Sequence, residues 1–324
     1  MSSYWSGKRG LVTGGGGFLG SHVVNHLREK DCGELFVVRS RDYDLTREAD
    51  VERLYKEHPS DVVMHLAGYV GGIFANRNYP GDFFYRNLMM GALVCHYAYK
   101  SGATKVVAAG AGCGYPEFAP QPIKEEDYWS GYPQDDSAPY SLAKRMLHVQ
   151  SMAYWRQYKF PIIDIIPGNI YGEWDNFDLN AAHVIPALVR KFVEAVDDGH
   201  ASLPVWGSGK PTRDFVYAGD VAEGMVLAAE KFEEPVLMNM SSGRDHAIRE
   251  VIDILTEITG FKGAIDWQLD KPEGQISRRF DMSKAKSLLG FEAHTGLKDG
   301  LKKTLDWYRA NRAEARNLVV EAAE

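Results

Sequence analysis

Residues 9–20 read RGLVTGGGGFLG, an apolar strand pattern that runs directly into a glycine-rich segment. Gly14, Gly17 and Gly20 lie where this strand gives way to an expected helix over residues 20–30. Glycines at such a junction let a pyrophosphate approach backbone amides at the positive end of a helix. A plain tight turn is the alternative, but the strand before the glycines and the helix after them disfavour it. The segment therefore predicts a dinucleotide-binding site.

Short β-rich runs alternate with helical patterns through the first half of the chain. Further strands are expected in ELFVVRS (34–40), DVVMHLAG (61–68), KVVAAGAG (105–112) and PIIDIIPGNIYG (161–172), and helices near 47–57, 87–100 and 140–158. Such alternation is typical of a parallel sheet wrapped by helices. We therefore expect an α/β fold, a Rossmann-like doubly wound parallel sheet of six or more strands, with a smaller C-terminal substrate-binding α/β region.

The pattern also divides the chain into two expected domains. Residues 1–172 form the dinucleotide-binding domain, to which residues 214–232 return, and residues 173–324 form the substrate-binding domain. The last part of the chain predicts a helix over 247–259, a strand near AIDW (264–267) and a terminal helix over 301–309.

The composition is typical of an ordinary folded enzyme. Of 324 residues, 45% are hydrophobic and 25% are charged, which disfavours global disorder. The net charge of −7 disfavours broad electrostatic binding to nucleic acid or to an anionic membrane. The N-terminus has no hydrophobic signal core and no apolar stretch is long enough to cross a bilayer. We expect a cytoplasmic protein with no nucleic-acid or membrane partner.

Cysteine and histidine spacing gives no sign of a metal site. Cys32, Cys95 and Cys113 cannot all pair and show no C-x-x-C spacing, which fits a reducing compartment and argues against a zinc module. His22 and His26 have helical i, i+4 spacing but lack the glutamate of a zinc-protease motif. We expect no metal.

The end of the second expected strand indicates which dinucleotide binds. An acidic residue at this place accepts hydrogen bonds from the ribose 2′-hydroxyl of NADH, but here the chain reads Val38, Arg39, Ser40 and Arg41. Guanidinium groups make charge-assisted bonds to a 2′-phosphate. Solvated loop charges are the alternative. The pattern favours NADP(H).

PYSLAK (139–144) places Tyr140 and Lys144 four residues apart, on one face of the expected helix. An ammonium group near a phenol lowers the pKa of the phenol, so that tyrosine can exchange protons near neutral pH. Such pairs also occur by chance on helix surfaces. The position after the glycine segment favours the catalytic interpretation.

TGGGGFLG (13–20), YSLAK (140–144) and PGNIYG (167–172) together resemble the extended short-chain dehydrogenase/reductases that act on nucleotide sugars. Within that group the chain resembles the GDP-L-fucose synthase family, the epimerase/reductases of GDP-4-keto-6-deoxy-mannose. The supporting stretches follow the same order from about residue 11 to residue 220: VVRSRD, YVGGIFANRNYPGDFFYRNLMM, GCGYP, YGEWDNFDLNAAHVIPALVRKF and VWGSGKPTRDF. The last hundred residues match more loosely.

The resemblance implies a role for each matching residue. Tyr140 protonates the C4 oxygen with Lys144 as its partner, and Cys113 and His183 are the base and acid of epimerisation, in either assignment. A buried structural thiol and a solvated imidazole are the alternatives. The expected NADP(H) contacts are Gly14, Gly17, Phe18, Leu19, Gly20, Arg39, Arg41, Leu66, Ala67, Tyr140, Lys144 and Asn169. The expected GDP-sugar contacts are Asn169, His183, Arg190, Lys191, Trp206, Arg213 and Arg278.

One position departs from the family pattern. The family has a serine or threonine at the end of the strand KVVAAG, where this sequence has Ala111. The missing hydroxyl normally bonds the C4 oxygen during reduction. An engineered substitution, a different proton donor and an altered activity all stay open. The altered activity would be C4 reduction or epimerisation of a related GDP-hexose or GDP-heptose, or nucleotide-sugar binding without catalysis.

The expected partners are a GDP-sugar substrate and a second copy of the chain. The helices that contain residues 87–100 and 140–158 are rich in apolar residues that could form a dimerising helix bundle or pack in the core: Met89, Met90, Leu93, Met146 and Met152.

Overall fold

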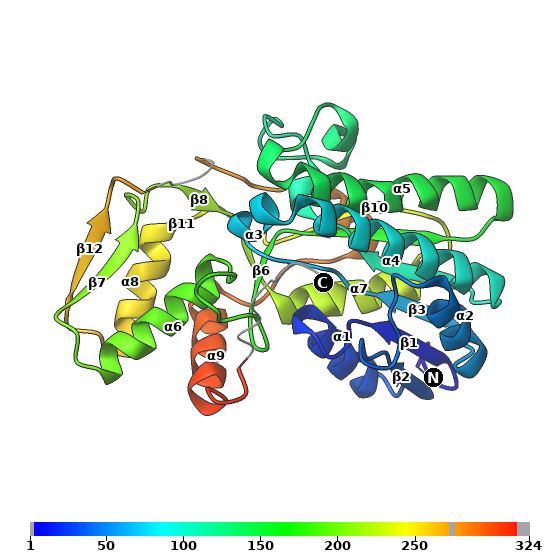
Figure 1. Cartoon of the computed structure of the whole chain (residues 1–324), viewed down its shortest axis with the longest axis horizontal. Helices are drawn as coiled ribbons and strands as arrows, with labels where there is room; N and C mark the ends of the chain where they lie inside the picture. Colours follow the sequence, from blue (N-terminus) through cyan, green and yellow to red (C-terminus); the bar gives the residue numbers. More distant parts are fainter. Residues whose placement is uncertain (1–2, 272–275, 316–324) are drawn as a thin grey trace.

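A six-stranded parallel sheet forms the centre of the molecule, and its strands β1, β2, β3 and β10 are labelled in Figure 1. The strand order is β10-β5-β4-β3-β1-β2. The structure, a computed structural model, describes residues 3–271 and 276–315. The strands are β1 (Arg9–Thr13), β2 (Glu34–Val37), β3 (Val62–His65), β4 (Lys105–Ala109), β5 (Ile162–Pro167) and β10 (Leu237–Met240). The topological switch point, where doubly wound sheets bind ligands, lies between β1 and β3. The expected α/β fold is confirmed.

Helices cover both faces of this sheet. One face carries α1 (Phe18–Glu29) and α7 (Ala218–Lys231), and the other carries α2 (Glu48–Glu57), α4 (Pro80–Lys100) and α5 (Ala138–Tyr158). Every residue of β3, β4 and β5 is buried, as expected for strands covered on both sides. Four apolar side chains at helical spacing attach α1 to the sheet: Leu19, Val23, Val24 and Leu27.

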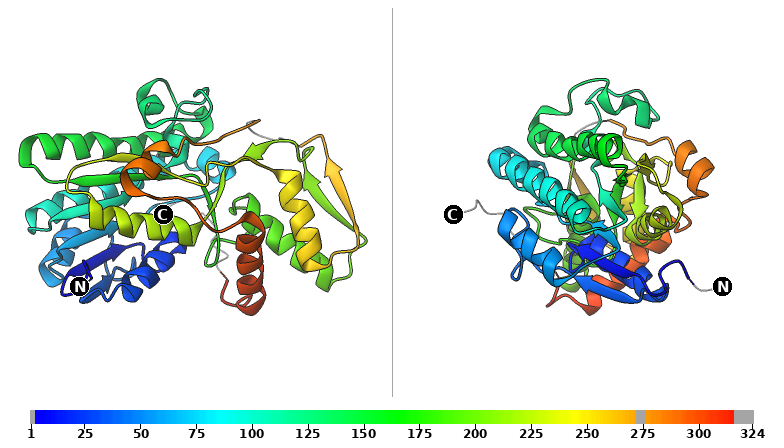
Figure 2. Two further views of the ribbon diagram at one scale, coloured as in Figure 1. Left: turned by 180° about the vertical axis from the view of Figure 1, so that it is seen from behind. Right: turned by 90° about the vertical axis from the view of Figure 1, so that its right-hand side faces the viewer.

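A smaller lobe with its own core lies at one end of the sheet (Figure 2). It contains the parallel pair β7 (Ser202–Trp206) and β12 (Ala264–Gln268), with α6 (Val184–Asp197), α8 (Ile248–Thr259) and α9 (Leu297–Ala310). Two further strand pairs connect the lobes: β6 (Asn169–Tyr171) with β9 (Phe215–Tyr217), and β8 (Thr212–Arg213) with β11 (His246–Ala247). The short helices are α3 (Ile73–Asn78), η1 (Gly112–Gly114), η2 (Glu125–Trp129), η3 (Asp135–Ser137) and η4 (Ala285–Leu289).

The expected strand over 161–172 is interrupted. β5 ends at Pro167, and after Gly168 the chain pairs with β9 instead of continuing the central sheet. Gly168 is required here because a Cβ would overlap the Ser241 side chain. Among the described residues, no helix is long and apolar enough to cross a membrane.

Candidate active site

The glycine segment lies at the switch point, against the end of β3. Gly14 has φ +70°, and a Cβ there would lie 2.7 Å from the Ala67 amide nitrogen. The Thr13 hydroxyl holds this neighbour in place by accepting the N–H groups of Leu66 and Ala67 at 3.2 and 3.3 Å. Phe18 begins α1 directly after Gly17. The structure thus brings together the cofactor positions expected from both strand ends.

Arg39 lies over the glycine segment. A Cβ at Gly16 would overlap its guanidinium group, so glycine at position 16 gives the arginine room. Arg41 points away, with 83% of its side chain exposed and an ion pair of 3.7 Å to Asp42. The structure therefore places Arg39, but not Arg41, against the loop that would hold a dinucleotide.

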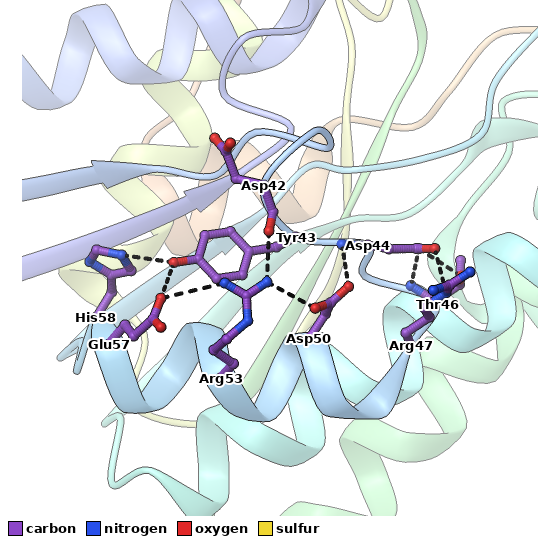
Figure 3. A network of polar contacts seen from close by, with 9 residues as sticks. All are labelled: Asp42, Tyr43, Asp44, Thr46, Arg47, Asp50, Arg53, Glu57 and His58. Atoms are coloured by element: carbon purple, nitrogen blue, oxygen red, sulfur yellow. Dashed lines mark hydrogen bonds and ion pairs between the residues drawn. The ribbon is translucent and has the colours of Figure 1, made fainter.

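A polar network fixes the segment that follows these arginines (Figure 3). Arg53 on α2 donates to the Asp42 carbonyl at 2.8 Å and to the Asp50 carboxylate at 2.9 Å. The Tyr43 hydroxyl donates to Glu57 at 2.5 Å. These bonds attach residues 42 and 43, which follow β2, to α2. They therefore hold in place the segment that contains Arg39 and Arg41.

Tyr140 and Lys144 lie on the first turns of α5, near the end of β4. The Lys144 ammonium group is buried and donates to the Ala109 carbonyl at 3.0 Å. We expected Lys144 to lower the pKa of Tyr140, but burial, with a smaller contribution from Cys113, raises that pKa. The physical reason is that desolvation of the phenol dominates, while a backbone carbonyl binds the Lys144 ammonium group. Tyr140 is therefore a neutral phenol that can donate a proton.

Ala111 and Cys113 follow β4 in the tight turn around η1. Ala111 is buried, and Cys113 is half-buried. Burial raises the pKa of the Cys113 thiol, while Ser141 and Arg278 act in the opposite direction. Arg278 reaches this turn from a distant segment and donates to the Gly112 carbonyl at 2.6 Å. The structure thus brings Arg278 beside the candidate catalytic turn.

Arg213 and Arg278 are near enough to interact electrostatically, and Asp245 partly offsets this effect on Arg213. Burial lowers the pKa of Arg213, and the charge of Arg278 lowers it further. Two interacting positive charges favour a bound anion. Such a pair suits a diphosphate.

Asp214 is a buried, multiply bonded carboxylate that the sequence did not reveal. Its buried carboxylate accepts the N–H groups of Ser242, Gly243 and Phe280 at 3.0 to 3.1 Å. Its backbone carbonyl accepts the N–H groups of Asn169, from the main chain at 3.1 Å and from the side chain at 3.3 Å. A charged residue inside an apolar strand pattern, here RDFVY, was the available signal.

The remaining candidates lie in the smaller lobe. His183 is the residue before α6 and is exposed, although desolvation by the surrounding chain lowers the pKa of its imidazole. Among the described residues, no hydrogen bond or ion pair joins it to Cys113. Arg190 donates to Glu194 at 2.8 Å and to the Phe177 carbonyl at 3.1 Å, so its guanidinium group supports the loop before α6. Lys191 is half-buried, and Trp206, at the end of β7, is 61% exposed.

Known proteins resemble this chain in sequence and in fold. The model of the NAD dependent epimerase/dehydratase family matches residues 10–240. A GDP-L-fucose synthase from Sinorhizobium fredii is 38% identical over 95% of this chain and 98% of that protein. The structure of a GDP-L-fucose synthetase from Naegleria fowleri bound to NADP has a TM-score of 0.88 at 27% identity, covering 96% of this chain and 98% of that chain.

A GDP-6-OMe-4-keto-L-xylo-heptose reductase from C. jejuni has a TM-score of 0.86 at 26% identity and covers 94% of this chain and 98% of that chain. The family model covers most of the described sheet and includes the glycine segment, Tyr140 and Lys144. The chain belongs to the NAD dependent epimerase/dehydratase family.

Proposed function

We propose that this chain is an NADPH-dependent epimerase/reductase that converts a GDP-4-keto-6-deoxy-hexose into a GDP-L-fucose-type sugar. The observation that carries the proposal is the meeting of Tyr140, Lys144 and Cys113 at the end of β4, in a chain whose relatives are GDP-L-fucose synthases. A dinucleotide-binding glycine segment lies two strands away in the same sheet.

The cofactor site fits NADP(H). Gly14 and Gly16 leave space that a Cβ would fill, and Arg39 lies beside that space with the charge a 2′-phosphate needs. The proposed contacts also include the backbone around Leu66 and Ala67. The side chain of Leu19 is buried, so Leu19 is proposed to contact the cofactor through its backbone. NADPH, when bound, supplies the hydride for C4.

Tyr140 is the proposed proton donor in C4 reduction. Its raised pKa keeps the phenol protonated at neutral pH, and a protonated donor is what a ketone oxygen needs as it becomes an alcohol. Lys144 is its proposed partner: the Ala109 carbonyl holds the ammonium group, which carries a positive charge on the same face of α5.

Cys113 and His183 are the proposed epimerisation groups. A C4 ketone acidifies the hydrogens on C3 and C5, and inversion requires removal of a proton on one face and its return on the other. Both side chains have pKa values shifted by desolvation, which raises that of the thiol and lowers that of the imidazole. At neutral pH the thiol therefore carries a proton and the imidazole has a free lone pair.

The GDP moiety is proposed to bind between the lobes. Arg213 and Arg278 suit the diphosphate, and Lys191 is better placed than Arg190 to assist because Arg190 already bonds Glu194 and Phe177. The exposed indole of Trp206 offers a stacking surface. Asn169 lies between the cofactor and substrate regions.

A C4 reductase of a related GDP-hexose or GDP-heptose is the second candidate. The similarity to the GDP-heptose reductase from C. jejuni favours it, and Ala111 leaves room for altered chemistry.

We also propose a homodimer formed through α4 and α5. These helices pack side by side, and their outer faces expose Phe84, Tyr85, Val149 and Met152. Met90 and Leu93 instead pack against the core. Core packing is the alternative that the sequence offers for these apolar positions.

The proposed domain division is residues 1–172 with 214–232 for the cofactor, and the rest of 173–324 for the sugar nucleotide. Within that second part, β10 (Leu237–Met240) and residues 285–291 pack with the central sheet instead. The proposed compartment is the cytoplasm, since Cys32, Cys95 and Cys113 are all free thiols.

The test is to incubate the purified chain with NADPH and GDP-4-keto-6-deoxy-mannose and to follow NADPH absorbance and product stereochemistry. We expect NADPH oxidation and a product inverted at C3 and C5. Oxidation without inversion would favour the second candidate. No oxidation with any GDP-4-keto sugar would contradict both.

A further inference from the structure

Asp164 is a buried carboxyl group that the roles proposed above leave unused. It lies in the middle of β5 with none of its surface exposed. Among the described residues, no donor bonds either of its carboxyl oxygens. An ionised carboxylate is costly to bury, and burial raises the pKa of Asp164 to about 7. Its charge therefore changes within the pH range in which most enzymes work.

The backbone of β4 makes room for this carboxyl group. Asp164 pairs in register with Ala108, and the Gly110 N–H donates to the Ile165 carbonyl at 2.8 Å. A Cβ at residue 110 would lie 2.5 Å from Asp164 Oδ1. The carboxyl group thus lies directly behind the residue that precedes Ala111.

Lys144 lies close to Asp164 across two consecutive residues of the chain after β4. Its ammonium group donates to the Ala109 carbonyl at 3.0 Å, and the next residue, Gly110, is the one whose Cβ position lies 2.5 Å from Asp164 Oδ1. Burial lowers the pKa of Lys144, and the charge of Asp164 raises it. Three other titratable groups face Asp164: Cys95 from α4, Tyr115 from the segment after η1, and Tyr128 from η2. Burial raises the pKa of all three, so they are neutral at physiological pH. Cys113 and His65 interact with Lys144, and burial keeps both of them neutral as well. Asp164 and Lys144 are therefore the two groups here whose charges act on each other.

We propose that Asp164 is a positioning residue for the catalytic pair: its carboxylate keeps the Lys144 ammonium group protonated in the dehydrated site behind Tyr140. This inference rests on the roles proposed for Tyr140 and Lys144. Above neutral pH the carboxylate is ionised, and its field opposes the proton loss that burial favours at Lys144. The titrations of the two groups are coupled, so removing the charge of one group should shift the pKa of the other.

The first test is the pH dependence of NADPH-dependent reduction in Asp164→Asn, which removes the charge and preserves the shape. The alkaline limb of kcat/KM should move to lower pH by on the order of one unit, because Lys144 loses its proton earlier. Asp220→Asn is the matched control, since it neutralises another buried carboxylate that bonds Thr295 on the far side of the sheet. Its profile should follow that of the native chain.

The second test needs no turnover. The protein is labelled with [4-¹³C]aspartate and its carboxyl signals are followed by NMR. The Asp164 signal is identified because it is missing from the spectrum of Asp164→Asn. Asp164→Ser serves the same purpose if the Asn variant does not fold. The Asp164 signal should titrate near pH 7 and shift upward in Lys144→Met, because the stabilising positive charge is gone. Equal alkaline limbs in the native chain and Asp164→Asn, or an Asp164 signal unaffected by Lys144→Met, would overturn the inference. Absence of turnover in the native chain would count against the proposed function, while the labelled signal would still decide this inference.

Discussion

Ala111 places a buried methyl group at the end of β4, two residues before Cys113. The family hydroxyl would donate to the C4 oxygen as negative charge develops on it. We predict that Ala111→Ser accelerates single-turnover reduction by NADPH, by at most about 10²–10³-fold, which is the usual effect of one well-placed donor. GDP binding should change little because Arg278, the proposed contact beside this turn, bonds the backbone carbonyl of Gly112, which the substitution does not remove. An unchanged rate would mean that another group already donates.

Arg39 and Arg41 are predicted to contribute unequally to cofactor choice. Arg39 lies against Gly16, whereas Arg41 is mostly exposed and pairs with Asp42. Arg39→Ala should weaken NADPH binding by about 2 kcal/mol, the scale of a hydrogen bond to a charged group, and leave NADH binding nearly unchanged. Arg41→Ala, measured in the same titration, should have the smaller effect. A larger loss in Arg41→Ala would reject this geometry.

Asp164 also makes stability depend on pH. Its folded pKa, about 7, exceeds the unfolded value of 3.8, so the folded state holds an extra proton between these values and loses stability as pH rises through them. Asp164→Asn does not lose stability in this way, because asparagine has no proton to release in this pH range. Relative to the native chain, its free energy of unfolding should rise by up to about 4 kcal/mol between pH 4 and pH 8. Urea titrations at both pH values measure this. If the free energies of unfolding of the variant and the native chain differ by the same amount at pH 4 and pH 8, the raised pKa of Asp164 is contradicted.

The Asp214 side chain connects three segments of the chain: its own, which follows β8, the one after β10, and the one around residue 280. Asp214→Ala leaves three backbone N–H groups without their carboxylate. We predict a loss of at least about 3 kcal/mol in the free energy of unfolding, and a raised KM for the GDP-sugar because Arg213 and Arg278 lose their support. Loss of stability alone, with KM unchanged, would remove Asp214 from the support of the substrate site.

The strands and helices of the first half were predictable because their burial is regular. Strands buried on both faces read as apolar runs, and α1 repeats apolar residues at helical spacing. The sequence did not predict β10 as a member of the sheet, since LMNM contains a buried asparagine, Asn239, whose partners are distant in sequence. The break at Gly168 also depends on a distant residue, Ser241.

At the scale of the whole molecule, long-range contacts decide which candidates meet. The glycine segment and the Tyr140–Lys144 spacing are local patterns, so the sequence sufficed to propose them. The bond from Arg278 to Gly112 spans 166 residues, and the engagement of Arg190 with Phe177 depends on how the loop before α6 folds. Neither leaves a periodic signal in the sequence.

The proposed dimer predicts a change in mass. Val149→Glu combined with Met152→Glu places charges on the exposed face of α5, where 48% and 49% of these residues are accessible. The variant should sediment as a monomer while its free energy of unfolding changes by less than about 1 kcal/mol. Phe118→Glu, on an exposed loop outside α4 and α5, is the control and should leave the mass unchanged. A native chain that is already monomeric would contradict the dimer.

The central claim is that one site both inverts and reduces the sugar. The most direct measurement is the isotope pattern of the product formed from GDP-4-keto-6-deoxy-mannose and NADPH in deuterated water. We predict deuterium at C3 and C5, from Cys113 and His183 after exchange with solvent, and protium from NADPH at C4. A reduced product without deuterium at C3 and C5 would contradict it.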